Sequence, residues 1–134
     1  MTHKKLMLVL LFLTAGTLTA QQPMAKQAKV TPLMSRDLAD IRGKEVSVIT
    51  VEYAPGGSDP IHRHNAHGFI YVLAGTIMMQ VKGGKQVTLT PEQTFYEAPD
   101  DIHVVGRNAS STKPAKFLVF LLKEKGAPAL VPES

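Results

Sequence analysis

From residue 44 onward, the hydrophobic residues of this chain occur in short runs separated by glycine, proline and polar residues. Many residues of these runs are β-branched or aromatic, and no run keeps the 3.6-residue period of an amphipathic helix. The runs cover residues 46–53, 69–73, 76–82, 86–90, 94–98, 102–106 and 116–122. Many short strands at nearly regular spacing predict an all-β fold, and a small antiparallel β-barrel fits this pattern best.

The first twenty residues follow a different pattern. Lys4 and Lys5 precede an apolar run over residues 6–18, and Ala20 offers a small residue at a cleavage point. A transmembrane anchor would need about 20 consecutive apolar residues, whereas this run is interrupted by threonines and a glycine. Residues 1–20 are therefore predicted to be a cleavable signal peptide. The protein is expected to be periplasmic or secreted, with no stable membrane anchor after cleavage.

The rest of the chain is expected to divide into a leader or extended segment over residues 21–43, a barrel over residues 44–123 and a tail over residues 124–134 that lies extended on the surface. Removing the two lysines of the signal peptide from the 15 basic residues leaves 13, against 11 acidic ones. No basic run or arginine stripe remains, so nucleic-acid binding is not expected. The chain has no cysteine, which excludes disulfides and thiolate ligands.

Four histidines remain after residue 20, and they occupy two places. His62, His64 and His67 lie in one segment, and His103 follows a proline turn further along. Successive side chains of a strand point to opposite faces, so His62 and His64 share a face. Imidazole is the commonest protein ligand of transition metals. Two histidines on one face with a third downstream predict a metal site with open coordination positions.

The segment from Gly56 to Gly75 resembles the first sequence motif of the cupin superfamily. In that motif a glycine precedes His-x-His by five residues, a glutamate follows, and a glycine closes the segment. Gly56, His62, His64 and Gly75 fall at the matching positions.

The stretch from Pro99 to His103 resembles the second cupin motif, in which a proline turn leads to a histidine. The resemblance covers residues 44–122. It implies a jelly-roll barrel with a metal held inside by histidines of both motifs. The chain also resembles the small exported single-domain cupins of the quercetin-dioxygenase type.

Four positions depart from the family pattern, and two of them are glycines of the second motif that are replaced by the acidic residues Glu92 and Asp100. Gly68 stands where cupins carry the glutamate ligand, and Arg107 stands where the second motif has an asparagine. The first interpretation of the missing glutamate is a bare three-histidine site of His62, His64 and His103, as in cupin dioxygenases that bind iron without a carboxylate.

Two other interpretations rank below it. In the second, His67 replaces the glutamate, which would require a β-bulge because strict alternation puts residue 67 on the opposite face. In the third and last, a nearby carboxylate such as Glu97 or Glu52 serves instead. A simpler role for His67 is a hydrogen-bonded position outside the barrel.

The resemblance implies a divalent transition metal, namely iron, manganese, nickel or zinc, and a small-molecule ligand or substrate. It favours a metal-dependent dioxygenase acting on a small organic molecule, with no general base identified. The alternative is a non-catalytic module that binds a small ligand or sequesters metal. The resemblance also allows two barrels to pair as a homodimer.

Overall fold

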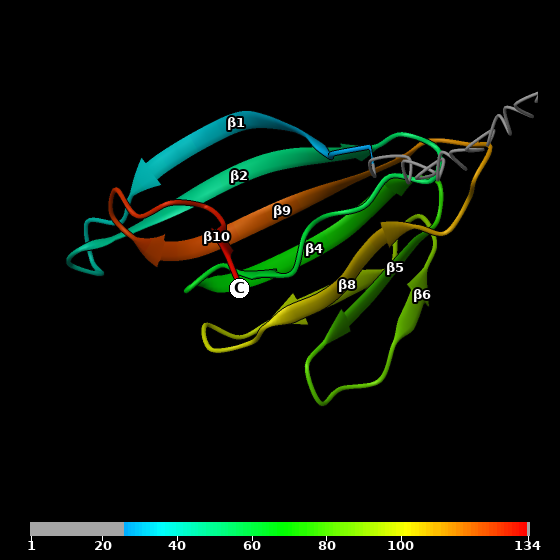
Figure 1. Ribbon diagram of the computed structural model, residues 1–134. Coiled ribbons are helices and arrows are strands. Elements are labelled where there is room, and N and C mark those ends of the chain that lie inside the picture. Colours follow the sequence, from blue (N-terminus) through cyan, green and yellow to red (C-terminus); the bar gives the residue numbers. More distant parts are fainter. Residues whose placement is uncertain (1–25, 134) are drawn as a thin grey trace, which may run out of the picture.

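The computed structural model describes residues 26–133, which form two five-stranded antiparallel sheets, one above the other in Figure 1. The strand order is β1-β2-β9-β4-β7 in the larger sheet and β10-β3-β8-β5-β6 in the smaller one. The strands are β1 (Lys29–Asp37), β2 (Lys44–Tyr53), β3 (His62–Arg63), β4 (His67–Ala74), β5 (Ile77–Val81), β6 (Val87–Leu89), β7 (Thr94–Glu97), β8 (His103–Asn108), β9 (Ala115–Glu124) and β10 (Val131–Pro132).

Each of the seven hydrophobic runs overlaps one strand, and the two antiparallel sheets confirm the prediction of an antiparallel jelly-roll barrel. The reason is visible in β9, where buried and more accessible residues alternate along the strand. Its buried side chains face the interior together with those of β2, β4 and β5. The core between the sheets includes Val51, Tyr53, Val72, Ile77, Met79, Phe117, Val119 and Leu121.

The larger sheet begins earlier in the chain than the sequence suggested. Residues 29–37, expected to be part of a leader, form β1 and pair with β2 from Glu52 back to Glu45. A register shift between Pro32 and Met34 accommodates the proline, which cannot donate a ladder hydrogen bond. The predicted signal peptide of residues 1–20 lies outside the described residues. Within residues 26–133, no helix is long and apolar enough to cross a membrane.

The segment after β9, expected as a surface tail, packs against the barrel. β10 pairs with β3, and the N–H of Glu133 donates to the carbonyl of Ile61 at 3.0 Å. Arg63 and Glu133 form an ion pair across the same two segments. The buried Lys123 donates a hydrogen bond to the carbonyl of Ala127 at 2.6 Å. We call residues 127–133 the C-terminal strap; they run along β3 and include β10, the edge strand of the smaller sheet.

Candidate metal centre

His62, His64 and His103 come together in the interior between the two sheets. Each offers one ring nitrogen, and the three nitrogens all lie within 4.8 Å of one another. His62 on β3 and His103 on β8 are directly opposite residues of an antiparallel pair, and their ring centroids are 4.9 Å apart. His62 and His103 are 2% and 4% exposed, so these two histidines are almost fully shielded from solvent.

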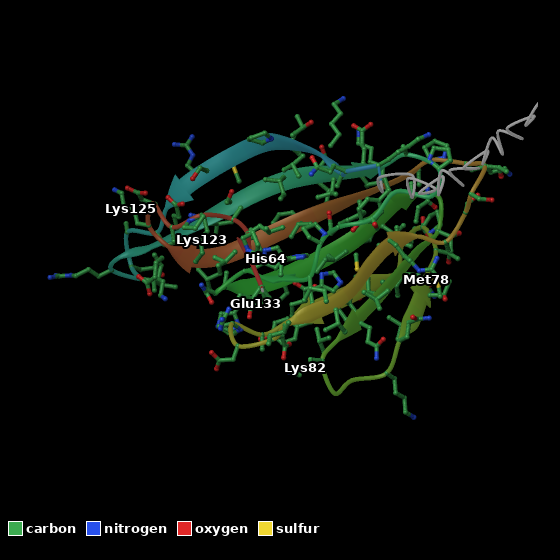
Figure 2. The ribbon with its side chains drawn as sticks, viewed as in Figure 1. His64, Met78, Lys82, Lys123, Lys125 and Glu133 are labelled. Atoms are coloured by element: carbon green, nitrogen blue, oxygen red, sulfur yellow. The ribbon has the colours of Figure 1, made fainter. Side chains whose placement is uncertain are left out.

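Backbone carbonyls orient two of the imidazoles. Nδ1 of His62 lies 2.8 Å from the carbonyl oxygen of Pro60, and Nδ1 of His64 bonds to the carbonyl of Ala129 in the C-terminal strap. A carbonyl only accepts, so each Nδ1 carries the proton and the lone pair of each neutral ring lies on Nε2. This outer support of a histidine by a carbonyl is typical of metal ligands. In Figure 2, His64 appears beside the end of the chain that carries Glu133.

The two Nε2 atoms of His62 and His64 then face each other at 3.2 Å. In neutral rings with protonated Nδ1 atoms, neither Nε2 has a hydrogen to donate. Two nitrogens bound to one metal at about 2.0–2.1 Å would lie about 2.9 Å apart at a right angle and about 3.3 Å apart at a tetrahedral angle. The observed spacing falls within this range, so this pair of imidazoles fits a shared divalent ion.

A buried carboxylate completes the cluster. Glu97, at the end of β7, is 2% exposed. Its Oε2 lies 3.1 Å from Nε2 of His64, and its Oε1 lies 2.9 Å from Nδ1 of His103. Oε1 and both ring nitrogens of His103 are buried without a hydrogen-bond partner in suitable geometry. Buried polar atoms normally have a partner, so these orphaned atoms also fit the binding of a cation.

The protonation states of the carboxylate and the histidines in the cluster depend on one another. Burial on its own raises the pKa of Glu97, but the close contacts with His103 and His64 outweigh it and lower this pKa to about 2. Burial on its own lowers the pKa of His64, but its contact with Glu97 raises this pKa overall. Burial lowers the pKa of His62. A neutral His62 beside an ionised Glu97 is a protonation state suited to binding a cation.

The cluster opens into a mostly apolar cavity of about 70 Å³. Ile49, Ile70, Met79 and Val119 line it from the two sheets, and Leu130 lines it from the C-terminal strap. Drug-sized ligands occupy pockets of roughly 300–1,000 Å³, so this cavity suits a ligand of only a few heavy atoms.

The structure does not bring His67 to the cluster. Strand β4 turns residues 68, 70 and 72 inward and leaves His67 on the outer face. There Nδ1 of His67 lies 2.8 Å from the hydroxyl of Tyr96, and the two rings stack with centroids 6.1 Å apart. No bulge reverses this orientation, so the position outside the barrel is the one observed.

Glu52, the other carboxylate considered, is also away from the cluster. It forms ion pairs with Lys116 at 3.3 Å and Lys29 at 3.9 Å, along the paired strands β2, β9 and β1. Its side chain is 37% exposed. The third interpretation of the missing glutamate named Glu97 and Glu52 together. Of these two carboxylates, Glu97 is the one that lies in the site.

Sequence reasoning missed a second carboxylate that lines the cavity. Asp59 accepts a hydrogen bond from the hydroxyl of the fully buried Tyr53 at 2.5 Å. Burial and the charge of Asp59 raise the pKa of Tyr53, so this phenol stays protonated. The only available signal was the position of Asp59, three residues before His62 in the same turn.

The stretch that resembles the second cupin motif contains one extra residue between His103 and its asparagine. Val81 pairs with His103 and Gln80 with Val105, so Val104 is a bulge residue on β8. Asn108, and not residue 107, is therefore the buried asparagine. Its side chain donates to the carbonyls of Ala54 at 3.1 Å and of Lys113 at 2.7 Å, which ties together the loops at that end of the barrel.

The comparison with family models agrees with this geometry. The model of the cupin domain family matches residues 49–121. The chain therefore belongs to the cupin family, and its histidine cluster suggests a divalent metal site. Among curated proteins, none matches the sequence significantly.

Several solved structures share the fold. An uncharacterized conserved protein with a double-stranded β-helix domain from Klebsiella pneumoniae is 15% identical, with a TM-score of 0.63 over 84% of this chain and 90% of that one. The polyketide cyclase RemF from Streptomyces resistomycificus is 25% identical, with a TM-score of 0.60 over 84% and 76%. A recombinant oxalate oxidase in complex with glycolate is 25% identical, with a TM-score of 0.59 over 78% and 54%. This chain thus spans only about half the length of the oxalate oxidase.

Proposed function

We propose that this protein is a metal-binding cupin in which His62, His64 and His103 hold one divalent transition ion at the inner end of the cavity. The observation that carries this proposal is the spacing of the two facing Nε2 atoms, 3.2 Å, with both Nδ1 atoms engaged by backbone carbonyls. Imidazole and carboxylate donors fit iron, manganese, nickel or zinc.

Such an ion would supply Lewis-acid chemistry and, if it is iron or manganese, electron transfer. The chain itself contributes a dry pocket and orients the bound molecule. The proposed reaction is the oxidation of a small organic molecule by oxygen. A cavity of about 70 Å³ favours short organic acids and small diketones over flavonoid-sized substrates. The glycolate complex of the similar oxalate oxidase supports the same size class.

The metal proposal is tested by elemental analysis of protein purified without a histidine tag. We expect close to one ion per chain in the wild type and none in the His62→Ala and His64→Ala variants. The matched control is His67→Ala, because this histidine belongs to the same segment but lies on the outer face. Equal metal content in the wild type and both cluster variants would refute the site.

The reaction is tested by oxygen uptake of protein loaded anaerobically with iron or manganese. The panel contains glycolate, oxalate, small diketones, phenols and a flavonoid as the oversized control. We expect uptake with a short acid or small diketone and none with the flavonoid. Ligand binding measured by calorimetry without oxygen uptake would instead support the alternative, a non-catalytic binding module.

Export is a separate part of the proposal and rests on the pattern of residues 1–20. Expression of the full chain, followed by fractionation and N-terminal sequencing, tests it. We expect a product that begins near Gln21 outside the cytoplasm. A full-length product retained in the cytoplasm would contradict export without affecting the metal proposal.

A further inference from the structure

The position that lacks the family's glutamate has a specific neighbour. Gly68 on β4 lies directly opposite Glu97 on β7 in the antiparallel pairing. A Cβ atom added to Gly68 would lie 3.5 Å from Cβ and 3.5 Å from Oε2 of Glu97. The Glu97 side chain therefore fills the space that a side chain at residue 68 would enter.

We infer that Glu97 is the carboxylate ligand of the metal centre, delivered from β7 to the place where the family motif puts a glutamate on β4. This inference rests on the metal site proposed above and deepens it. A carboxylate moved to the directly opposite residue of a neighbouring strand can reach the same interior point, because paired Cβ atoms are only about 4.5–5.5 Å apart.

The contacts of Glu97 support a ligand role. Oε2 of Glu97 and Nε2 of His62 lie 3.1 Å and 3.2 Å from the same atom, Nε2 of His64. These three atoms are acceptors when Glu97 is ionised and the imidazoles are neutral. A buried anion is costly unless it is paired, and one cation between the three atoms would pair the carboxylate with both imidazoles. The spacing of about 3 Å is also that of atoms sharing one metal ion.

A different role for Glu97 must be distinguished from this one. Through Oε1, 2.9 Å from Nδ1 of His103, the carboxylate could only orient this histidine from outside the coordination sphere. Such an outer partner and a direct ligand both strengthen metal binding. Only a measurement that counts the donor atoms on the metal separates them.

The experiment uses the full chain, purified without a tag, stripped with a chelator and reloaded with Zn²⁺ or Co²⁺. X-ray absorption counts imidazole and carboxylate ligands, and competition with a chromophoric chelator gives Kd. The variants are Glu97→Gln, Glu97→Ala and the exchange variant Gly68→Glu/Glu97→Gly. The control is Glu52→Gln, a carboxylate that pairs with two surface lysines. Circular dichroism of each apo protein verifies folding, and the isosteric glutamine variant remains informative if the alanine variant does not fold.

We expect three imidazoles and one carboxylate in the wild type, and loss of the carboxylate with at least tenfold weaker binding in both single variants at residue 97. In the exchange variant we expect the carboxylate signal to return. The inference is overturned if Glu97→Gln weakens binding while the wild-type and variant coordination spheres are the same, or if its Kd is unchanged. Metal binding by the wild type is measured first. If the wild type binds no metal, the proposed function is refuted, whatever the Glu97 variants do.

Discussion

The two sheets of this barrel are built very differently. In the larger sheet, β2 and β9 pair through ten consecutive residues, from Lys44–Glu124 to Tyr53–Ala115. In the smaller sheet, β3 has two residues and pairs with β8 through the single pair His62–His103. The long ladder provides most of the scaffold, whereas the short one carries two histidines of the cluster, His62 and His103.

This difference shows how the histidines are held. A two-residue strand cannot fix its side chains by its ladder alone, so other contacts must fix them. The carbonyls of Pro60 and Ala129 hold His62 and His64, and Glu97 of the larger sheet contacts His64 and His103. We therefore expect scaffold variants to change stability and site variants to change metal affinity.

The largest expected effect belongs to the scaffold. Leu121 on β9 is fully buried and does not line the cavity. Leu121→Ala should lower the free energy of unfolding by about 2–5 kcal/mol, because it removes buried methyl groups and leaves a cavity. Urea unfolding of the apo protein measures this loss, and metal stoichiometry should stay at the wild-type value. A change below about 0.5 kcal/mol would mean that the core does not depend on β9.

The next effect is the pH dependence of folding stability, which arises from the contact of Glu97 in the larger sheet with His103 in the smaller one. The pKa of Glu97 in the folded protein is about 2, below its ordinary value of 4.5. The ionised carboxylate thus stabilises the fold above pH 4.5, and this stabilisation, on the order of 3 kcal/mol, is lost as the pH falls from 4.5 to 2.

Thermal unfolding of the apo protein between pH 2 and 6 measures this dependence. Glu97→Gln should flatten the profile in that window, whereas Glu52→Gln should leave it unchanged. Identical profiles for the wild type and Glu97→Gln would show that the ionised carboxylate does not stabilise the fold.

A smaller effect is expected from the C-terminal strap. Deleting residues 127–133 removes the carbonyl that orients His64 without removing any histidine. Metal affinity should fall by about 10–100-fold, the usual range for losing an outer contact to a ligand. Chelator competition measures the affinity. Glu133→Ala, which removes only the ion pair with Arg63, is the matched control and should cost much less.

The smallest effect concerns the space around His103. A Cβ atom at Gly106 would lie 2.9 Å from Cε1 of His103 and 3.1 Å from the hydroxyl of Tyr53. Gly106→Ala should therefore displace the imidazole and weaken metal binding by about tenfold, close to 1.4 kcal/mol. Gly83→Ala is not a suitable control, because Gly83 has a φ of +81°. His67→Ala is a better control, because its ring lies on the outer face beside Tyr96.

Local patterns in the sequence were sufficient for seven of the ten described strands and for the three histidines of the cluster. Period-two alternation placed His62 and His64 on one face, and the proline turn brought His103 to the start of a strand. Gly56 and Gly75 occupy left-handed turns with φ values of +70° and +73°, as expected at the ends of such a motif.

What the sequence did not predict depends on long-range pairing. Glu97 was ranked last because its pairing with Gly68, 29 residues earlier, cannot be read from local periodicity. The same holds for the contact of Ala129 with His64, which spans 65 residues. The bulge at Val104 was missed because a single inserted residue leaves the hydrophobic pattern of β8 almost unchanged.

The C-terminal strap also has a consequence for the order of events during synthesis. The carbonyl of Ala129 follows β1 to β9 in the chain, so it emerges from the ribosome after every histidine of the cluster. A nascent chain that has only just exposed His103 therefore lacks the contact that orients His64. We expect the ion to be acquired after translation, by a chain that has already closed its barrel.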